Sequence, residues 1–318
     1  MSAPVPLKGL HPLEYEHPYD SQALDAVRAT PGLDWFVRGY NKHAVERIIR
    51  LQYTGSHLRI SESNHPEVLA HLWAVCEVLN LPAVPELYLE WEYGINGFTI
   101  GVDHPIIVLT SGAIDLLETD ELRFLIGHEV GHIKSRHTLY HQVADYFPVI
   151  ADILADATFG ASNLTGPLQL ALKLALKHWS RMSEFTADRA GLLACQDLDV
   201  AARVMMKWSG MPVKHHASMN VAAFMDQARA FEAMDQDLLN KATKFMAIVG
   251  STHPWTVLRA AELTRWKEEG DYEKVLQRQT KEMVGTKTTS SGLLCRNCGR
   301  RLEGNEKFCE TCGARLKA

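Results

Sequence analysis

The chain has 318 residues, of which 46% are hydrophobic, and its formal net charge is −5. This length supports one large hydrophobic core, or one large domain with a small module beside it. The charge balance gives no support for a nucleic-acid-binding protein, so any nucleic-acid surface would have to be local.

The N-terminal part of the chain predicts an irregular arm followed by helices. The first twenty residues are rich in Pro and His and lack the basic and apolar stretches of a secretory signal. A short helix is expected from Asp20 to just before Pro31, and a longer one over residues 35–49. Pro66 suits the first position of a third helix, because apolar residues then recur at helical spacing.

A small sheet is expected next. Residues 86–92 alternate apolar with acidic side chains, as a half-exposed strand does. Residues 98–101 and 106–110 predict two more strands, and Asn96-Gly97 suggests a hairpin turn between the first strand and the second.

Helices predominate after the sheet. Caps are predicted at Ser111 and Thr119, and the second cap begins a nearly all-apolar helix through Arg136. Another long helix is expected from Pro167 to about Cys195. Further helices are predicted at residues 200–208, 221–248 and 255–268.

The best candidate for a membrane span is residues 139–176. Four charged side chains interrupt this segment and Lys177 follows it, whereas a span needs about 20 mostly apolar residues. We therefore expect a cytoplasmic protein, with peripheral contact to a membrane surface left open.

The residues from Gly127 to His132 contain the motif His-Glu-x-x-His. On a helix, His128 and His132 project from one face and can chelate one ion. Glu129 lies beside that face and can reach a water at the metal without being a ligand. The motif therefore predicts a zinc hydrolase in which Glu129 is the general base.

Catalytic zinc needs a third protein ligand. In metzincins this ligand is a His six residues after the second, with Gly at the third position. Those positions hold Thr138 and Ser135, which excludes that class. His137 and His141 would point about 180° and 220° away from His128 on a continuous helix, so we interpret both as surface or structural residues.

A carboxylate from a later helix is the remaining option. Glu184 fits, and Asp188 lies one turn further along the same face. Glu184 would bind the metal, and Asp188 would accept the second ring N–H of a ligand histidine and so fix its tautomer.

These motifs resemble those of the M48 family of metallopeptidases, which contains the CAAX prenyl proteases, the HtpX heat-shock proteases and the Oma1 proteases. The family pattern of His-Glu-x-x-His followed by Glu-x-x-x-Asp reads here HEVGH and EFTAD. Residues 96–101 look like the family's Asn-Ala-Phe-Ala strand, and residues 109–121 look like its approach to the motif helix. Residues 251–254, with Arg259 after them, look like its late His-Pro…Arg element.

The resemblance implies a gluzincin-type zincin fold of the α+β class, mostly α, with a small sheet before the motif helix. It implies that an edge strand binds an extended peptide by backbone hydrogen bonds. It also implies that Arg259 supports the ligands and that His253 approaches the zinc, either as an oxyanion donor or as a resting-state ligand. The residues expected to bind substrate are Asn96, Gly97, Phe98, Thr99, Ile100 and Gly101.

The C-terminus carries two Cys-x-x-Cys-Gly knuckles, each followed by a matching Arg-Leu pair. Four thiolates in this pattern predict a closed, structural zinc site in a short zinc ribbon. The module is locally basic but has little aromatic interleaving, which favours a protein partner over nucleic acid. The predicted ligands are Cys295, Cys298, Cys309 and Cys312.

The sequence therefore predicts a zinc-dependent endopeptidase acting on proteins or peptides, with a possible role in protein quality control. The alternative is a catalytically silent zinc-binding adaptor that recruits partners through its ribbon. Four segments are expected: an N-terminal helical region at residues 1–80, the peptidase core at 81–280, a flexible linker at 281–292 and the ribbon at 293–318. Cys76 and Cys195 lie in apolar runs and are expected to be buried thiols.

Overall fold

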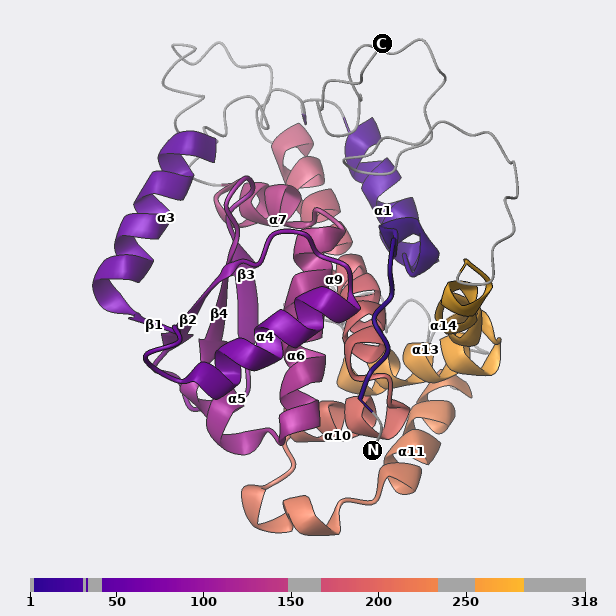
Figure 1. Cartoon of the computed structure of the whole chain (residues 1–318). Coiled ribbons are helices and arrows are strands. Elements are labelled where there is room, and N and C mark those ends of the chain that lie inside the picture. The colour runs from indigo at the N-terminus through magenta and orange to yellow at the C-terminus, as the bar shows by residue number, and fades with distance from the viewer. Residues whose placement is uncertain (1–2, 31–32, 34–41, 148–166, 234–254, 283–318) are drawn as a thin grey trace.

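A four-stranded sheet and two long helices beside it occupy the centre of the molecule (Figure 1). The computed structural model describes residues 3–30, 33, 42–147, 167–233 and 255–282. The sheet has the order β1-β2-β4-β3, in which β2 and β4 are parallel and the two outer pairs are antiparallel. Its strands are β1 (Leu58–Arg59), β2 (Glu86–Glu90), β3 (Gly97–Ile100) and β4 (Ile106–Thr110).

The hairpin predicted at Asn96-Gly97 is wrong, because β4 lies between β2 and β3. The Asn96 N–H donates to the Thr110 hydroxyl at 3.0 Å, and the Asn96 carbonyl accepts from the Thr110 N–H at 3.1 Å. Asn96 therefore begins the pairing of β3 with β4. As a consequence, β3 is an edge strand.

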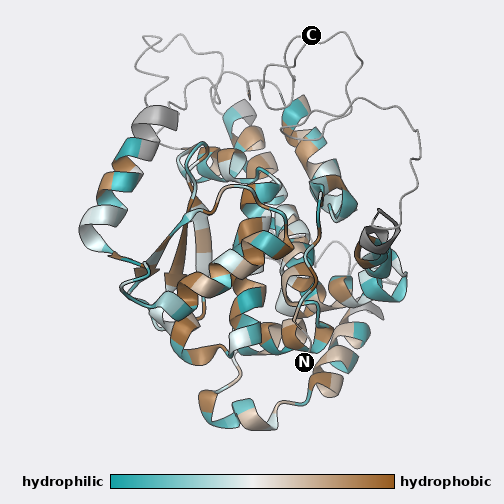
Figure 2. Cartoon of the chain, in the orientation of Figure 1, coloured by the Kyte–Doolittle hydropathy of each residue, from teal (hydrophilic) through white to brown (hydrophobic). Residues whose placement is uncertain are grey.

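The strands are largely apolar, as Figure 2 shows. All five residues of β4 are buried, which explains why its sequence is almost continuously apolar. The helix that carries the motif, α6 (Thr119–Lys134), packs beside the sheet and contacts β3 directly.

Two motif glycines of α6 allow it to lie very close to α9 (Pro167–Cys195). A Cβ added to Gly127 would lie 2.3 Å from the Ala194 Cβ, and one added to Gly131 would lie 2.6 Å from the Ala190 Cβ. Real Cβ atoms do not approach so closely, so the small side chains permit the contact. This contact is the most extensive between any two described elements.

The motif helix differs from prediction at both ends. Its N-cap is Glu118, whose N–H donates to the Glu121 carboxylate at 2.8 Å, rather than Thr119. It ends at Lys134, because Arg136 adopts a left-handed conformation with φ of 59°. A new helix, α7 (Thr138–Asp145), begins directly afterwards.

The other helices surround this centre. The N-terminal arm is packed rather than loose, since Leu7 and Tyr15 are fully buried. Cys76 and Cys195 are buried free thiols, as expected. Within the part of the chain that the structure describes, no helix is both long and apolar enough to cross a membrane. The remaining helices are α1 (Pro18–Ala29), α3 (Lys42–Ser56), α4 (Pro66–Val78), α5 (Ser111–Leu116), α10 (Leu198–Trp208), α11 (Val221–Ala233), α13 (Thr256–Glu268) and α14 (Asp271–Glu282), with short 3-10 helices at Pro12–Glu14 and Val213–Ser218.

Candidate metal centre

Three side chains from α6 and α9 converge in the interior. The Nε2 atoms of His128 and His132 lie 3.2 Å apart. Glu184 places Oε2 at 3.5 Å from the His128 Nε2 and Oε1 at 3.4 Å from the His132 Nε2. All three side chains are buried, and their ligand atoms are close enough to hold one metal ion. The structure thus brings together the three residues that the sequence predicts as ligands.

The far side of the His128 ring is held by a carboxylate. Its Nδ1 lies 3.1 Å from Asp188 Oδ1, as predicted from the sequence. Arg259, from α13, donates to both Asp188 oxygens, from Nε at 2.7 Å and from Nη2 at 2.6 Å. The Arg259 guanidinium also lies over the Trp208 ring, 4.7 Å from its centroid. The bidentate pair of Arg259 with Asp188 fixes the orientation of the Asp188 carboxylate and therefore that of the His128 ring.

The far side of the His132 ring meets a second histidine. Its Nδ1 lies 3.0 Å from the Nδ1 of His137, and the His137 Nε2 lies 3.0 Å from Asp20 Oδ2. His137 is only 3% exposed. The prediction that His137 points away from the site is wrong, because it assumed a continuous helix, whereas α6 ends before Arg136 reverses the backbone.

His141 is also closer to the site than a continuous helix allows. Its ring centroid lies 5.1 Å from that of His132, and its Nε2 lies 2.8 Å from the Ser183 hydroxyl. It is half-buried, so the prediction of a fully exposed surface residue is wrong.

Glu129 lies beside the three converging side chains and is 3% exposed. Thr99, on β3, donates its hydroxyl to Glu129 Oε2 at 2.8 Å. Burial raises the pKa of the Glu129 carboxyl, and the nearby His128 lowers it, with a result of about 7. A carboxyl with this pKa can exchange a proton near neutral pH.

The two motif histidines differ in their protonation in the metal-free chain. Burial lowers the pKa of both, but the hydrogen bonds with Asp188 and Glu184 raise that of His128 to about 9. For His132, burial dominates and the pKa falls to about 4. Burial raises the pKa of the Glu184 carboxyl, but the hydrogen bond and the charge of a protonated His128 hold that pKa well below its ordinary value.

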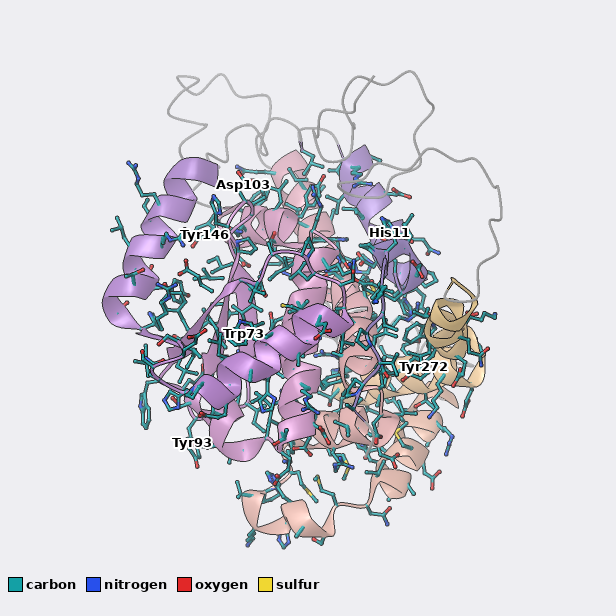
Figure 3. The ribbon with its side chains drawn as sticks, viewed as in Figure 1. His11, Trp73, Tyr93, Asp103, Tyr146 and Tyr272 are labelled. Carbon is teal, nitrogen blue, oxygen red and sulfur yellow. The ribbon has the colours of Figure 1, made fainter. Side chains whose placement is uncertain are left out.

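The predicted substrate strand is the open edge of the sheet. Tyr93 and Asp103, labelled in Figure 3, lie in the loops at its two ends. β3 pairs with β4 on one side, and no described strand pairs with its other side. A Cβ on Gly97 would lie 3.4 Å from Glu129 Oε1 and 3.1 Å from a Leu109 methyl group, so glycine keeps space beside the Glu129 carboxylate.

Some predicted site residues lie outside the described residues. They are His253 and the four cysteines Cys295, Cys298, Cys309 and Cys312. Besides the contacts of His137 and His141, the sequence does not predict three others: Asp20 with His137, Trp208 with Arg259, and the Thr99 hydroxyl with Glu129. An aspartate near the start of a helix is common, so Asp20 does not stand out in the sequence, and the spacing of apolar residues does not distinguish Trp208.

Comparison with known proteins agrees with this geometry. A family model described as peptidase family M48 matches residues 62–267, which is more than half of the chain, and a zinc-ribbon domain model matches residues 294–316.

Three curated proteins illustrate the similarity. The plastoglobule-localized metallopeptidase 48, chloroplastic, of Arabidopsis thaliana is 29% identical over 281 residues, which is 88% of this chain and 79% of that protein. A protease HtpX homolog of Polynucleobacter necessarius is 25% identical over 274 residues, covering 78% of this chain and 88% of the relative. Another, from a Sulfurihydrogenibium species, is 28% identical over 223 residues, covering 58% and 70%. No solved structure matches the chain.

Proposed function

Because the chain belongs to peptidase family M48, we propose that His128, His132 and Glu184 hold the catalytic zinc of a metalloendopeptidase and that Glu129 is its general base. The observation that carries the proposal is the spacing of the three ligand groups. Zinc binds nitrogen and oxygen ligands at about 2.0–2.2 Å, which in a tetrahedron separates neighbouring ligand atoms by about 3.3–3.6 Å. The two Nε2 atoms lie 3.2 Å apart, and the Glu184 carboxylate lies 3.5 Å from that of His128 through Oε2 and 3.4 Å from that of His132 through Oε1.

The donor set also suits the metal. Two imidazole nitrogens and one carboxylate are the three protein ligands of several catalytic zinc sites, with a fourth position left for water or substrate. A zinc ion held here would polarise a peptide carbonyl and lower the pKa of a bound water. The protein's own contribution is to exclude bulk water around the buried ligands and to place Glu129 beside them.

Glu129 is suited to take up and return one proton in each cycle. Thr99 occupies its Oε2, while Gly97 leaves room beside its Oε1. The carboxylate would accept a proton from the attacking water through Oε1 and later pass it to the leaving amine. Its pKa of about 7 matches both transfers at neutral pH.

The substrate would lie along the free edge of β3 as an added strand. The side of β3 that faces away from β4 would supply the backbone groups for this pairing, and Thr99 and Gly97 place the strand against Glu129. Backbone pairing gives affinity with little dependence on side chains, which suits a protease that acts on extended or unfolded chains. The four C-terminal cysteines are proposed to hold a second, structural zinc, supported by the zinc-ribbon match.

Cleavage of unfolded casein by the zinc-loaded chain tests the proposal. Glu129→Gln should keep zinc at the His/Glu site and lower the cleavage rate at least a hundredfold, because only the base is lost. Glu92→Gln, on an exposed residue in the loop after β2, is the matched control and should cleave normally.

Near-normal turnover by Glu129→Gln would contradict the mechanism. If the wild-type chain holds zinc at the His/Glu site but cleaves neither casein nor short extended peptides, the adaptor alternative is favoured instead.

A further inference from the structure

A row of three buried side chains connects α1 to the ligand His132. The His132 Nδ1 lies 3.0 Å from the His137 Nδ1, and the His137 Nε2 lies 3.0 Å from Asp20 Oδ2. Asp20 is completely buried, and it lies more than a hundred residues before His128 in sequence. It also lies outside residues 62–267, the segment that the M48 family model covers.

Asp20 is held in place by donors on both of its oxygens. The indole N–H of Trp179 donates to Oδ1 at 2.9 Å, and the Thr186 hydroxyl donates to Oδ2 at 2.6 Å. Both donors come from α9, the helix that carries Glu184. The carboxylate is therefore anchored to the same helix as one of the metal ligands.

The proton positions in this row follow from the chemistry of its ends. A carboxylate only accepts hydrogen bonds, so the His137 Nε2 carries the hydrogen that it donates to Asp20. In a neutral imidazole the other nitrogen is then an acceptor, so the His137 Nδ1 must receive its hydrogen from the His132 Nδ1. This leaves the His132 Nε2 without a hydrogen and turned toward His128 and Glu184.

Building on the proposed function, we propose that Asp20 and His137 are positioning residues that hold His132 in the tautomer and orientation that zinc binding requires. The two ligand histidines are then supported differently. His128 is held directly by the Asp188 carboxylate. His132 is held by a carboxylate acting through an intervening imidazole, and α1 becomes part of the metal centre.

Substitution of His137 tests the proposal. His137→Phe keeps an aromatic ring but removes both nitrogens, whereas the amide of His137→Gln can still accept from His132 and donate to Asp20. Asp20→Asn is nearly isosteric, but it removes the negative charge and presents an NH₂ group either to the Trp179 N–H or to the His137 N–H, both of which need an acceptor. The control is His17→Gln, because His17 is equally buried at the start of α1, but its side chain bonds to Glu262 and to the Tyr19 N–H and not to the side chains of the row.

The measurement is metal affinity of the full chain after removal of its metal. Zinc is titrated against a chromophoric chelator, and Co²⁺ absorption distinguishes the nitrogen/oxygen site from a four-thiolate site. Loss of a group that orients a ligand typically weakens metal binding 10- to 100-fold. We expect this loss for His137→Phe and Asp20→Asn, a change of less than about fivefold for His137→Gln, and no change for His17→Gln even if its melting temperature falls.

Unchanged affinity of His137→Phe would overturn the proposal. So would an equal loss in His17→Gln, which would indicate general damage to the fold, or an equal loss in His137→Gln. An additional metal ion bound by His132, His137 and His141, detected as extra nitrogen-coordinated Co²⁺, would also overturn it. If the wild-type chain shows no nitrogen/oxygen site at all, the proposed function itself fails, and this outcome is distinct from the others.

Discussion

Gly131→Ala would place a methyl group where α6 and α9 touch. Its Cβ would lie 2.6 Å from the Ala190 Cβ and 3.3 Å from the Ala187 Cα. Carbon atoms in contact settle at about 3.5–4.0 Å, so the two helices would have to separate locally by about 1 Å. Ala187 lies less than one turn from Glu184, so the separation would move this ligand away from His128 and His132.

The expected loss of stability is about 2 kcal/mol. Overpacking of a well-filled interior destabilises a protein by about 1–3 kcal/mol. We take about 3 kcal/mol, because the atoms that the new methyl group would meet belong to a helix and not to the end of a flexible side chain. The higher helix propensity of alanine stabilises the helix by about 1 kcal/mol relative to glycine. For a chain of this size, the net loss lowers the melting temperature by roughly 3 °C.

The assay combines thermal unfolding with zinc content after dialysis. Gly55→Ala in α3 is the control, because a Cβ there meets no atom within 4 Å, and it should leave stability equal or slightly higher. Adding Ala190→Gly to Gly131→Ala removes the nearest clash, so the double variant should be more stable than the sum of the two single effects. Wild-type stability and zinc retention in Gly131→Ala, or strict additivity in the double variant, would refute the reasoning.

Three further predictions concern the site and its boundary. Thr99→Val should lower kcat roughly 10- to 100-fold while zinc content stays normal, because Glu129 loses a charge-assisted hydrogen bond. Thr99→Ser keeps the hydroxyl and should retain most of the rate. A normal kcat in Thr99→Val would exclude a role of Thr99 in positioning Glu129. Removal of metal by a chelator should lower the melting temperature, and added zinc should restore it, since an ion bound only to the folded state stabilises it; an unchanged melting temperature would count against the metal centre. Truncation after Glu282 should leave a folded chain that keeps the zinc at His128, His132 and Glu184, and aggregation with loss of that zinc would show that the ribbon is integral to the fold.

Ligand chemistry made much of the site predictable from sequence. A helix with His at positions four apart requires a third ligand, and Glu184 with Asp188 one turn later is a pattern that one helix face can present. The structure places both carboxylates against the same histidine. Helical periodicity placed His128 with His132, and Glu184 with Asp188, on one face of each helix, and the two faces meet in the folded chain.

Predictions that crossed the end of an element failed. The orientation of His137 was calculated for a continuous helix, but one residue in the left-handed conformation, Arg136, turns the chain back toward the site. The Asn96-Gly97 pair is a strong local signal for a hairpin. It was overridden because β4, which is more apolar than β2, inserts between the two strands and is buried there. Neither outcome has a signature within a short window of sequence.

The role of α1 shows why part of the site was not predictable. Asp20 reaches His137 only because α1 packs on α9, and nothing near Asp20 in the sequence specifies that contact. The proposed metal centre therefore combines groups from α1, α6, α9 and α13, which come together only in the folded chain. When the free zinc concentration is a thousand times the dissociation constant, zinc binding stabilises the folded state by about 4 kcal/mol. By the same linkage, a change that releases Asp20 from α9 or Arg259 from Asp188 should weaken zinc binding, although neither residue is a ligand.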